Sequence, residues 1–189
     1  MKQKEFILGL DLDGCVADFY NQIRIFYSEW SGRDLKSLTS NVSYGMPEWG
    51  LDEDEYKRLH RYCVRQKGLF ETVSPISGAP QAIRELSTAG VRIRIISHRL
   101  FVPYFHSPAA SQTIVWLEKH GIPYRDLCLI EDKSAVYANI YVEDTVKNIE
   151  KLEKIERDVI CFTNSTNSYY SAKLRANSWK EAVRIILDK

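Results

Sequence analysis

Short apolar runs recur along this chain, and most of them alternate with segments of helical spacing. Five runs have the nearly continuous apolar character of strands that are buried on both faces, namely residues 6–10, 91–96, 127–130, 139–142 and 158–162. Amphipathic helices are expected at 80–89, 107–121, 145–155 and 178–187. Because parallel strands need crossover connections, this alternation predicts an α/β fold: a Rossmann-like parallel sheet flanked by helices.

One long interval, residues 15–76, breaks the alternation and contains no convincing strand. Residues 16–30 have helical spacing, and Asp52 with Glu55 matches the capping-box pattern that begins a second helix. A loop-like stretch, 31–50, separates the two. We therefore expect a small helical cap at 15–76, inserted after the first strand, and a core made of residues 1–14 and 77–189.

Composition excludes several classes of protein. The 189 residues include 26 Lys and Arg against 25 Asp and Glu, so no global charge favours polymeric nucleic acid or a membrane surface. The four cysteines are scattered without a CxxC pair, so structural zinc is not expected. The first apolar run is too short for a signal peptide or a membrane span, which predicts a cytoplasmic protein with reduced thiols.

Two acids follow the first predicted strand directly. Asp11 and Asp13 are two residues apart, so their side chains are expected on the same side, and Gly14 permits a tight turn after them. Close carboxylates repel each other unless a cation lies between them or one holds a proton. Magnesium accepts carboxylate oxygens, and a carboxylate can also attack phosphorus. The alternative is a loop of solvated acids or a helix N-cap.

Polar residues also follow the next two core strands. Ser97 and His98 come after 91–96, and Lys133 comes after 127–130. The serine can donate a hydrogen bond to a phosphate oxygen, and the lysine can neutralise a phosphoryl group. Taken singly, Ser97 is a turn residue, Lys133 an exposed loop lysine and His98 a structural hydrogen-bonding residue as readily as a substrate contact.

Asp144 follows the strand at 139–142 and can complete a metal site with Asp11 and Asp13, although it can equally cap the next helix. Open parallel sheets bind ligands beyond the carboxyl ends of their strands. The four fragments together therefore predict a phosphoryl-transfer site at this edge.

The order of these motifs, Asp-x-Asp-Gly, then Ser, then Lys, then an acid pair, resembles that of the haloacid dehalogenase-like phosphatases. The stretch 11–19, the cap after it and the segment 75–79 resemble the 5'(3')-deoxyribonucleotidases. The resemblance implies a haloacid dehalogenase-like core and hydrolysis of a phosphomonoester through an aspartyl-phosphate. It further implies a magnesium ion and a (deoxy)nucleoside monophosphate as substrate.

The resemblance also implies roles for individual residues. Asp11 is the nucleophile and a metal ligand, and Asp13 is the general acid–base, with its backbone carbonyl on the metal. Asp144 is the remaining protein ligand. Ser97 and Lys133 hold the phosphate.

On the substrate side, Phe19 helps to form the wall that faces the nucleobase. This chain departs from the family pattern at 99–110, which is longer and more aromatic, and at Thr113, where the family tends to have a lysine. The Tyr104-Phe105 pair can gate the site or form a homodimer contact. Two other functions stay open: a phosphatase of another small phosphoester, such as a phosphosugar, and a catalytically silent protein that binds a phosphorylated ligand without hydrolysing it.

Overall fold

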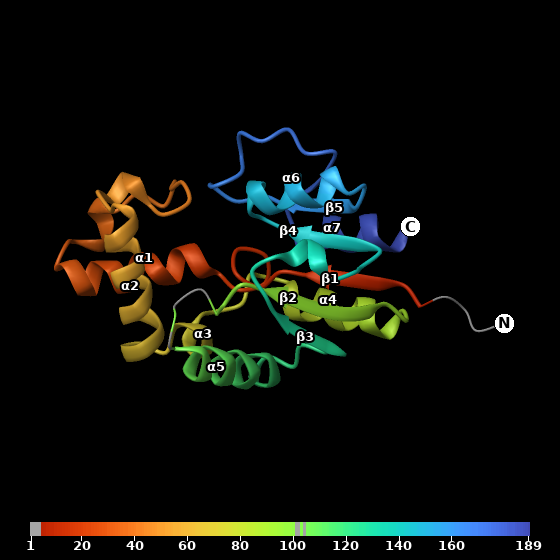
Figure 1. Cartoon of the computed structure of the whole chain (residues 1–189), viewed down its shortest axis with the longest axis horizontal. Coiled ribbons are helices and arrows are strands. Elements are labelled where there is room, and N and C mark those ends of the chain that lie inside the picture. The colour runs from red at the N-terminus through yellow and green to blue at the C-terminus, as the bar shows by residue number, and fades with distance from the viewer. Residues whose placement is uncertain (1–4, 101–102, 104) are drawn as a thin grey trace.

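Six parallel strands form one sheet, which confirms the predicted α/β class (Figure 1). The computed structural model describes residues 5–100, 103 and 105–189. The strand order is β3-β2-β1-β4-β5-β6. The bounds are β1 Ile7–Leu10, β2 Arg92–Ser97, β3 Asp126–Leu129, β4 Ile140–Glu143, β5 Asp158–Phe162 and β6 Leu174–Ala176.

The edge strand β6 was not predicted. It pairs with β5 in parallel, with Ile160 opposite Leu174 and Phe162 opposite Ala176. Three residues with Arg175 at the centre do not form an apolar run, because an edge strand is shielded on fewer sides than a central one.

Helices cover both faces of the sheet. On one face α4 (Ala79–Thr88), α5 (His106–Lys119) and α7 (Trp179–Leu187) pack with Leu8, Leu10 and other strand side chains in one buried cluster. On the other face α6 (Val146–Lys154) packs through Ile149 and Leu152 against Ile96 and Val159. The alternation of apolar side chains between these two clusters is the reason that the strands read as continuous apolar runs.

Helix α5 begins earlier than predicted. The sequence predicts a helix at 107–121, but the helix starts at His106, and its N-cap, Phe105, makes no side-chain capping bond. Pro108 lies in the first turn. Proline is tolerated there because the first N–H groups of a helix have no acceptor within it. Within α5, Ile114 is 39% exposed, whereas Thr113 is buried.

The segment between β1 and α4 is helical, with the bounds α1 Phe19–Ser31, η1 Leu35–Ser37, η2 Pro47–Trp49, α2 Glu53–Gln66 and α3 Leu69–Thr72. The capping box at the start of α2 is confirmed, since Asp52 and Glu55 each accept the other's backbone N–H at 2.7 and 3.0 Å. In Figure 1, α1 and α2 lie beyond one end of the sheet, and α3 lies against α5.

Most buried side chains of this segment form a hydrophobic cluster separate from the two on the sheet. Trp49 belongs to it: the indole is buried, stacks on Tyr27 at 5.2 Å and donates to the carbonyl of Thr39. We propose residues 15–76 as the cap and residues 1–14 with 77–189 as the core. None of the helices in the described ranges is both long and apolar enough to cross a bilayer.

Candidate active site

The strand order reverses direction between β1 and β4, and this is where an open parallel sheet forms a crevice at its carboxyl edge. Asp11 follows β1, and its backbone N–H donates to the carbonyl of Val142 in β4 at 3.1 Å. The register therefore places the acid after β1 beside the acids after β4, Glu143 and Asp144. The parallel pairing predicted from sequence brings these residues together as expected.

Lys133 lies between two acids and is not an exposed loop lysine. Its ammonium is 2.7 Å from Asp11 Oδ1 and 2.6 Å from Glu143 Oε2, and all three side chains are buried. Burial by itself lowers the pKa of Lys133, but the charges of Asp11 and Glu143 outweigh it and raise the pKa above its usual value. Lys133 is therefore a permanent cation at the floor of the site.

Asp144 is held by side chains that sequence reasoning missed. Tyr20 and Asn164 donate to its Oδ2 at 3.0 and 2.7 Å, and Asn167 donates to its backbone carbonyl at 2.9 Å. Tyr20 comes from α1, whereas both asparagines come from the connection after β5. Nothing in their sequence context marks these residues, because they act only through the fold.

The acids at this edge outnumber the cations that are buried with them. Burial, followed by the charge of Glu143, raises the pKa of Asp11 well above its ordinary value, and the same causes raise the pKa of Asp144 to about 7. Ligand atoms of Asp11, Cys15 and Asp144 lie within 4.8 Å of one another. The two carboxylates are the hard oxygen donors that suit Mg²⁺, whereas the thiol is not. A divalent cation would offset both the burial and the like charges that raise these pKa values.

Gly14 is required by the packing of this cluster. Its φ is +85°, and a Cβ atom built on it would lie 2.1 Å from Asp144 Oδ2. Gly14 thus lets the turn after β1 pass directly against the carboxylate after β4.

We expect Gly14→Ala to lower both stability and activity. The left-handed backbone costs an alanine about 1–2 kcal/mol, and Asp144 must also move, which at an active site can cost about 10²-fold in rate. Melting temperature and kcat should both fall. The matched control is Gly45→Ala, which has φ +81° and nothing within 4 Å of the added carbon. Equal losses of activity in both variants would contradict the steric argument.

Asp13 is paired with an arginine that the sequence analysis did not single out. Arg99 Nη2 donates to Asp13 Oδ1 at 2.7 Å, and Arg99 Nε donates to Oδ2 at 3.0 Å. Arg99 begins the segment 99–110, which we described only as long and aromatic. Its position two residues after Ser97 at a strand end was the available signal. Residues 101, 102 and 104 lie outside the described residues, and with them the proposed gate or dimer contact at Tyr104.

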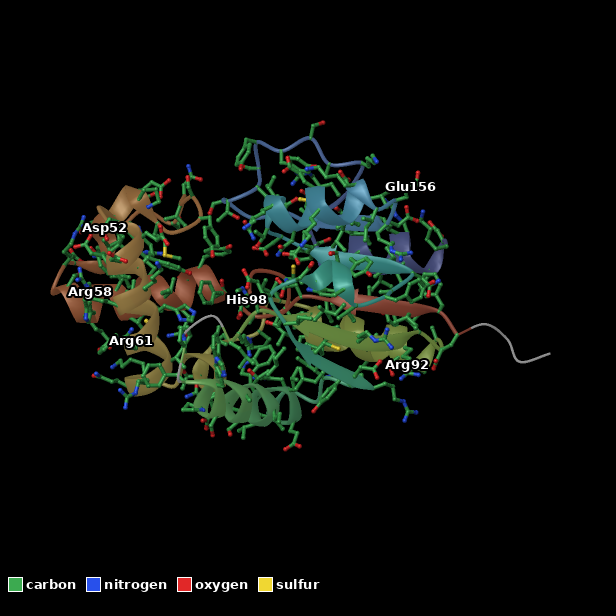
Figure 2. All side chains as sticks on the ribbon, viewed as in Figure 1. Asp52, Arg58, Arg61, Arg92, His98 and Glu156 are labelled. Carbon is green, nitrogen blue, oxygen red and sulfur yellow. The ribbon has the colours of Figure 1, made fainter. Side chains whose placement is uncertain are left out.

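A cavity of about 700 Å³ opens above these groups, between the core and the cap. In Figure 2, His98 lies where the core meets the cap. Asp144 is not among the lining residues and lies beneath the floor, 1% exposed. The other predicted site residues all line the cavity, and these are Asp11, Asp13, Phe19, Ser97, His98 and Lys133.

The fold is that of the haloacid dehalogenase-like hydrolases. A haloacid dehalogenase-like family hydrolase from Streptococcus pneumoniae superposes with a TM-score of 0.62 at 14% identity, over 95% of this chain and 97% of the other. A defluorinating L-2-haloacid dehalogenase gives 0.59 at 9% identity, over 96% and 95%. Since enzymes of different chemistry share this fold, the fold alone does not decide the reaction.

The family is decided by sequence. Residues 5–189 match the model of the 5' nucleotidase, deoxy (pyrimidine), cytosolic type C protein family, and the chain belongs to that family. A protein named "Putative 5'(3')-deoxyribonucleotidase" from Chlorobaculum tepidum is 45% identical over 187 residues, 98% of this chain and 92% of its own length. One of the same name from Bordetella bronchiseptica is 28% identical over 150 residues, 73% of each chain. The chain is thus a phosphatase of the nucleotidase type, which confirms the resemblance found in the sequence.

Proposed function

We propose that this protein is a magnesium-dependent phosphatase of deoxyribonucleoside monophosphates that works through an aspartyl-phosphate on Asp11. The observation that carries the proposal is the position of Asp11: it lies on the cavity floor, 2.7 Å from the ammonium of Lys133 and within one cluster with Asp144. A carboxylate placed beside a fixed cation can attack a phosphorus whose negative oxygens that cation neutralises.

The reaction takes two steps. A carboxylate oxygen of Asp11 forms a bond to phosphorus while the bond to the ester oxygen breaks, and Asp13 gives its proton to that leaving oxygen. Asp13 then takes a proton from a water molecule as the water attacks phosphorus and releases Asp11. Lys133 and Ser97, which both line the cavity, hold the phosphoryl oxygens.

Asp11, Asp144 and the backbone carbonyl of Asp13 would hold the magnesium ion. When bound, the ion supplies positive charge to the phosphate and to the crowded carboxylates. The raised pKa values of Asp11 and Asp144 support this assignment, since they reflect carboxylates that are buried among too few positive charges.

A nucleotide suits the cavity in size and in lining. About 700 Å³ is within the usual range of small-ligand sites. Aromatic side chains are among the residues that line it, including Phe19, Tyr44, Tyr56 and Phe70, beside the charged and polar ones. Aromatic faces favour a flat base, which a phosphosugar lacks. The names of the relatives support the same substrate class.

A substrate panel tests the proposal. We expect the purified protein with Mg²⁺ to give its highest kcat/KM with deoxyribonucleoside 5'- or 3'-monophosphates, when these are compared with ribonucleotides and sugar phosphates. Hydrolysis of sugar phosphates alone would exclude the nucleotide assignment. If no phosphoester is hydrolysed, the proposed activity is wrong, and the alternative of a protein that binds a phosphorylated ligand without hydrolysing it is favoured.

We expect removal of magnesium to stop turnover and to lower the melting temperature. A cation that binds only the native state at 100 times its Kd stabilises that state by about 2.7 kcal/mol, and a chelator removes this contribution. Asp144→Asn is the matched control, because it should melt at the same temperature with and without Mg²⁺. Undiminished turnover in chelator would contradict the metal site.

A further inference from the structure

Three hydrogen bonds join Arg99 to Asp13, the proposed acid–base. Arg99 Nε reaches Oδ1 at 3.3 Å and Oδ2 at 3.0 Å, and Nη2 reaches Oδ1 at 2.7 Å. Such a fork fixes the plane of a carboxylate as well as its place, which a lysine cannot do. Asp13 keeps 23% of its side chain exposed to the cavity, whereas the Arg99 side chain is fully buried. Arg99 therefore holds the carboxylate from its buried side, and the carboxylate stays accessible from the cavity.

The guanidinium itself is held by its surroundings. Phe70 lies 4.4 Å from it, measured to the ring centroid, and Trp116 lies 5.6 Å away. Arg99 Nη1 donates to Thr113 Oγ1 at 3.2 Å, and that hydroxyl donates to the carbonyl of Ala109. Contacts from α3 and α5 thus orient the arginine before any substrate binds.

We infer that Arg99 is a positioning residue that holds Asp13 in the orientation needed for proton transfer. The inference rests on the proposed function, in which Asp13 donates to the leaving oxygen and then accepts from water. A proton-transfer group must lie within hydrogen-bond reach of its partner, and small errors in position are costly. Arg99 keeps its own proton, so it acts through Asp13 and not as an acid. Because Phe70 belongs to the cap, the position of the acid depends on how the cap packs on the core.

The two steps need Asp13 differently, which allows a specific test. A nucleotide loses a poor leaving group that must be protonated in the first step. p-Nitrophenyl phosphate loses a good leaving group that departs unprotonated, so it needs Asp13 only when water attacks the phosphoenzyme. Rapid-mixing measurements of the first turnover separate the steps for both esters.

For Arg99→Met we expect the first turnover with a deoxynucleotide to slow about 10–100-fold, within the range that acid–base catalysis contributes. The rate of the first release of p-nitrophenol should change less than about threefold, because this leaving group departs without a proton from Asp13. The later turnovers should be slow, so the product appears as a burst followed by a slow steady state. Arg99→Lys should recover part of the nucleotide rate. Asp13→Asn should give the same pattern as Arg99→Met with larger effects.

The matched control is Arg92→Met. Arg92 donates two similar hydrogen bonds to Asp126, at 3.1 and 2.9 Å, but it lies at the start of β2, whereas His98 follows the end of that strand (Figure 2). The variant should leave the rates with both esters unchanged. If Arg99→Met slows the first turnover of both esters equally, or of neither, Arg99 does not position Asp13. A wild-type protein that hydrolyses neither ester would overturn the proposed function, and this inference with it.

Discussion

Asp11→Asn should abolish phosphatase activity and leave the protein folded. The variant keeps the size of the side chain but loses the charged oxygen that attacks phosphorus. Loss of a covalent nucleophile lowers kcat by about 10⁴-fold or more in enzymes that form such intermediates. Steady-state hydrolysis of a deoxynucleotide with saturating Mg²⁺ measures the loss. The matched control is Asp158→Asn, the same change at an exposed acid at the start of β5, where the amino ends of the strands lie.

The same variant should be at least as stable as the wild type in chelator. Burial and Glu143 raise the pKa of Asp11 in the folded protein, so at neutral pH the ionised side chain opposes folding. The neutral amide removes that opposition, and Lys133 keeps Glu143 as its partner. Thermal melting in chelator checks this. Retained magnesium-dependent turnover would reject Asp11 as the nucleophile, whatever the melting temperature.

Lys133→Met should remove both activity and much of the stability. The methionine leaves Asp11 and Glu143 buried without their cation, and the loss of one partner from a buried ion pair costs about 3–5 kcal/mol. The phosphate loses a positive contact at the same time. Denaturant unfolding measures the first effect, and kcat/KM measures the second. Lys57→Met is the control, since Lys57 pairs with Glu53 at the surface, does not line the cavity, and such pairs contribute about 1 kcal/mol or less.

A second change distinguishes the two effects of Lys133. Glu143→Gln added to Lys133→Met removes one of the stranded charges, so part of the lost stability should return while activity stays low. The midpoint of denaturant unfolding should then lie between those of the wild type and the single variant. No recovery would mean that the buried charge cluster is not the source of the instability.

Much of the site could be predicted from the sequence, because parallel strands bring their carboxyl ends to one edge. Asp11, Ser97 and Lys133 each follow an apolar run, and the order of the runs was enough to place them in one cavity. Asp144 was predicted at the same edge for the same reason. The helices of the cap and the capping box at Asp52 could also be predicted, since they depend on the spacing of residues that are close together in the sequence.

Other features depended on contacts between distant segments. The partners of Asp144 come from α1 and from the connection after β5, and the partner of Asp13 lies 86 residues along the chain. Lys133 was predicted to hold the phosphate, but its position between two acids, Asp11 and Glu143, comes from the fold alone. The edge strand β6 was likewise missed, because pairing and not composition defines it.

The sequence alone was enough to predict the chemistry that we propose: strand-end acids, a serine and a lysine stand in an order that predicts phosphoryl transfer by Asp11. Only the tertiary structure decided how each group is held, with Lys133 between Asp11 and Glu143 and Arg99 on Asp13. The physical reason is that periodicity within a segment reveals which residues share a face or an end of a strand. The pairing of buried charges is set by which distant side chains the packed core brings within hydrogen-bond reach.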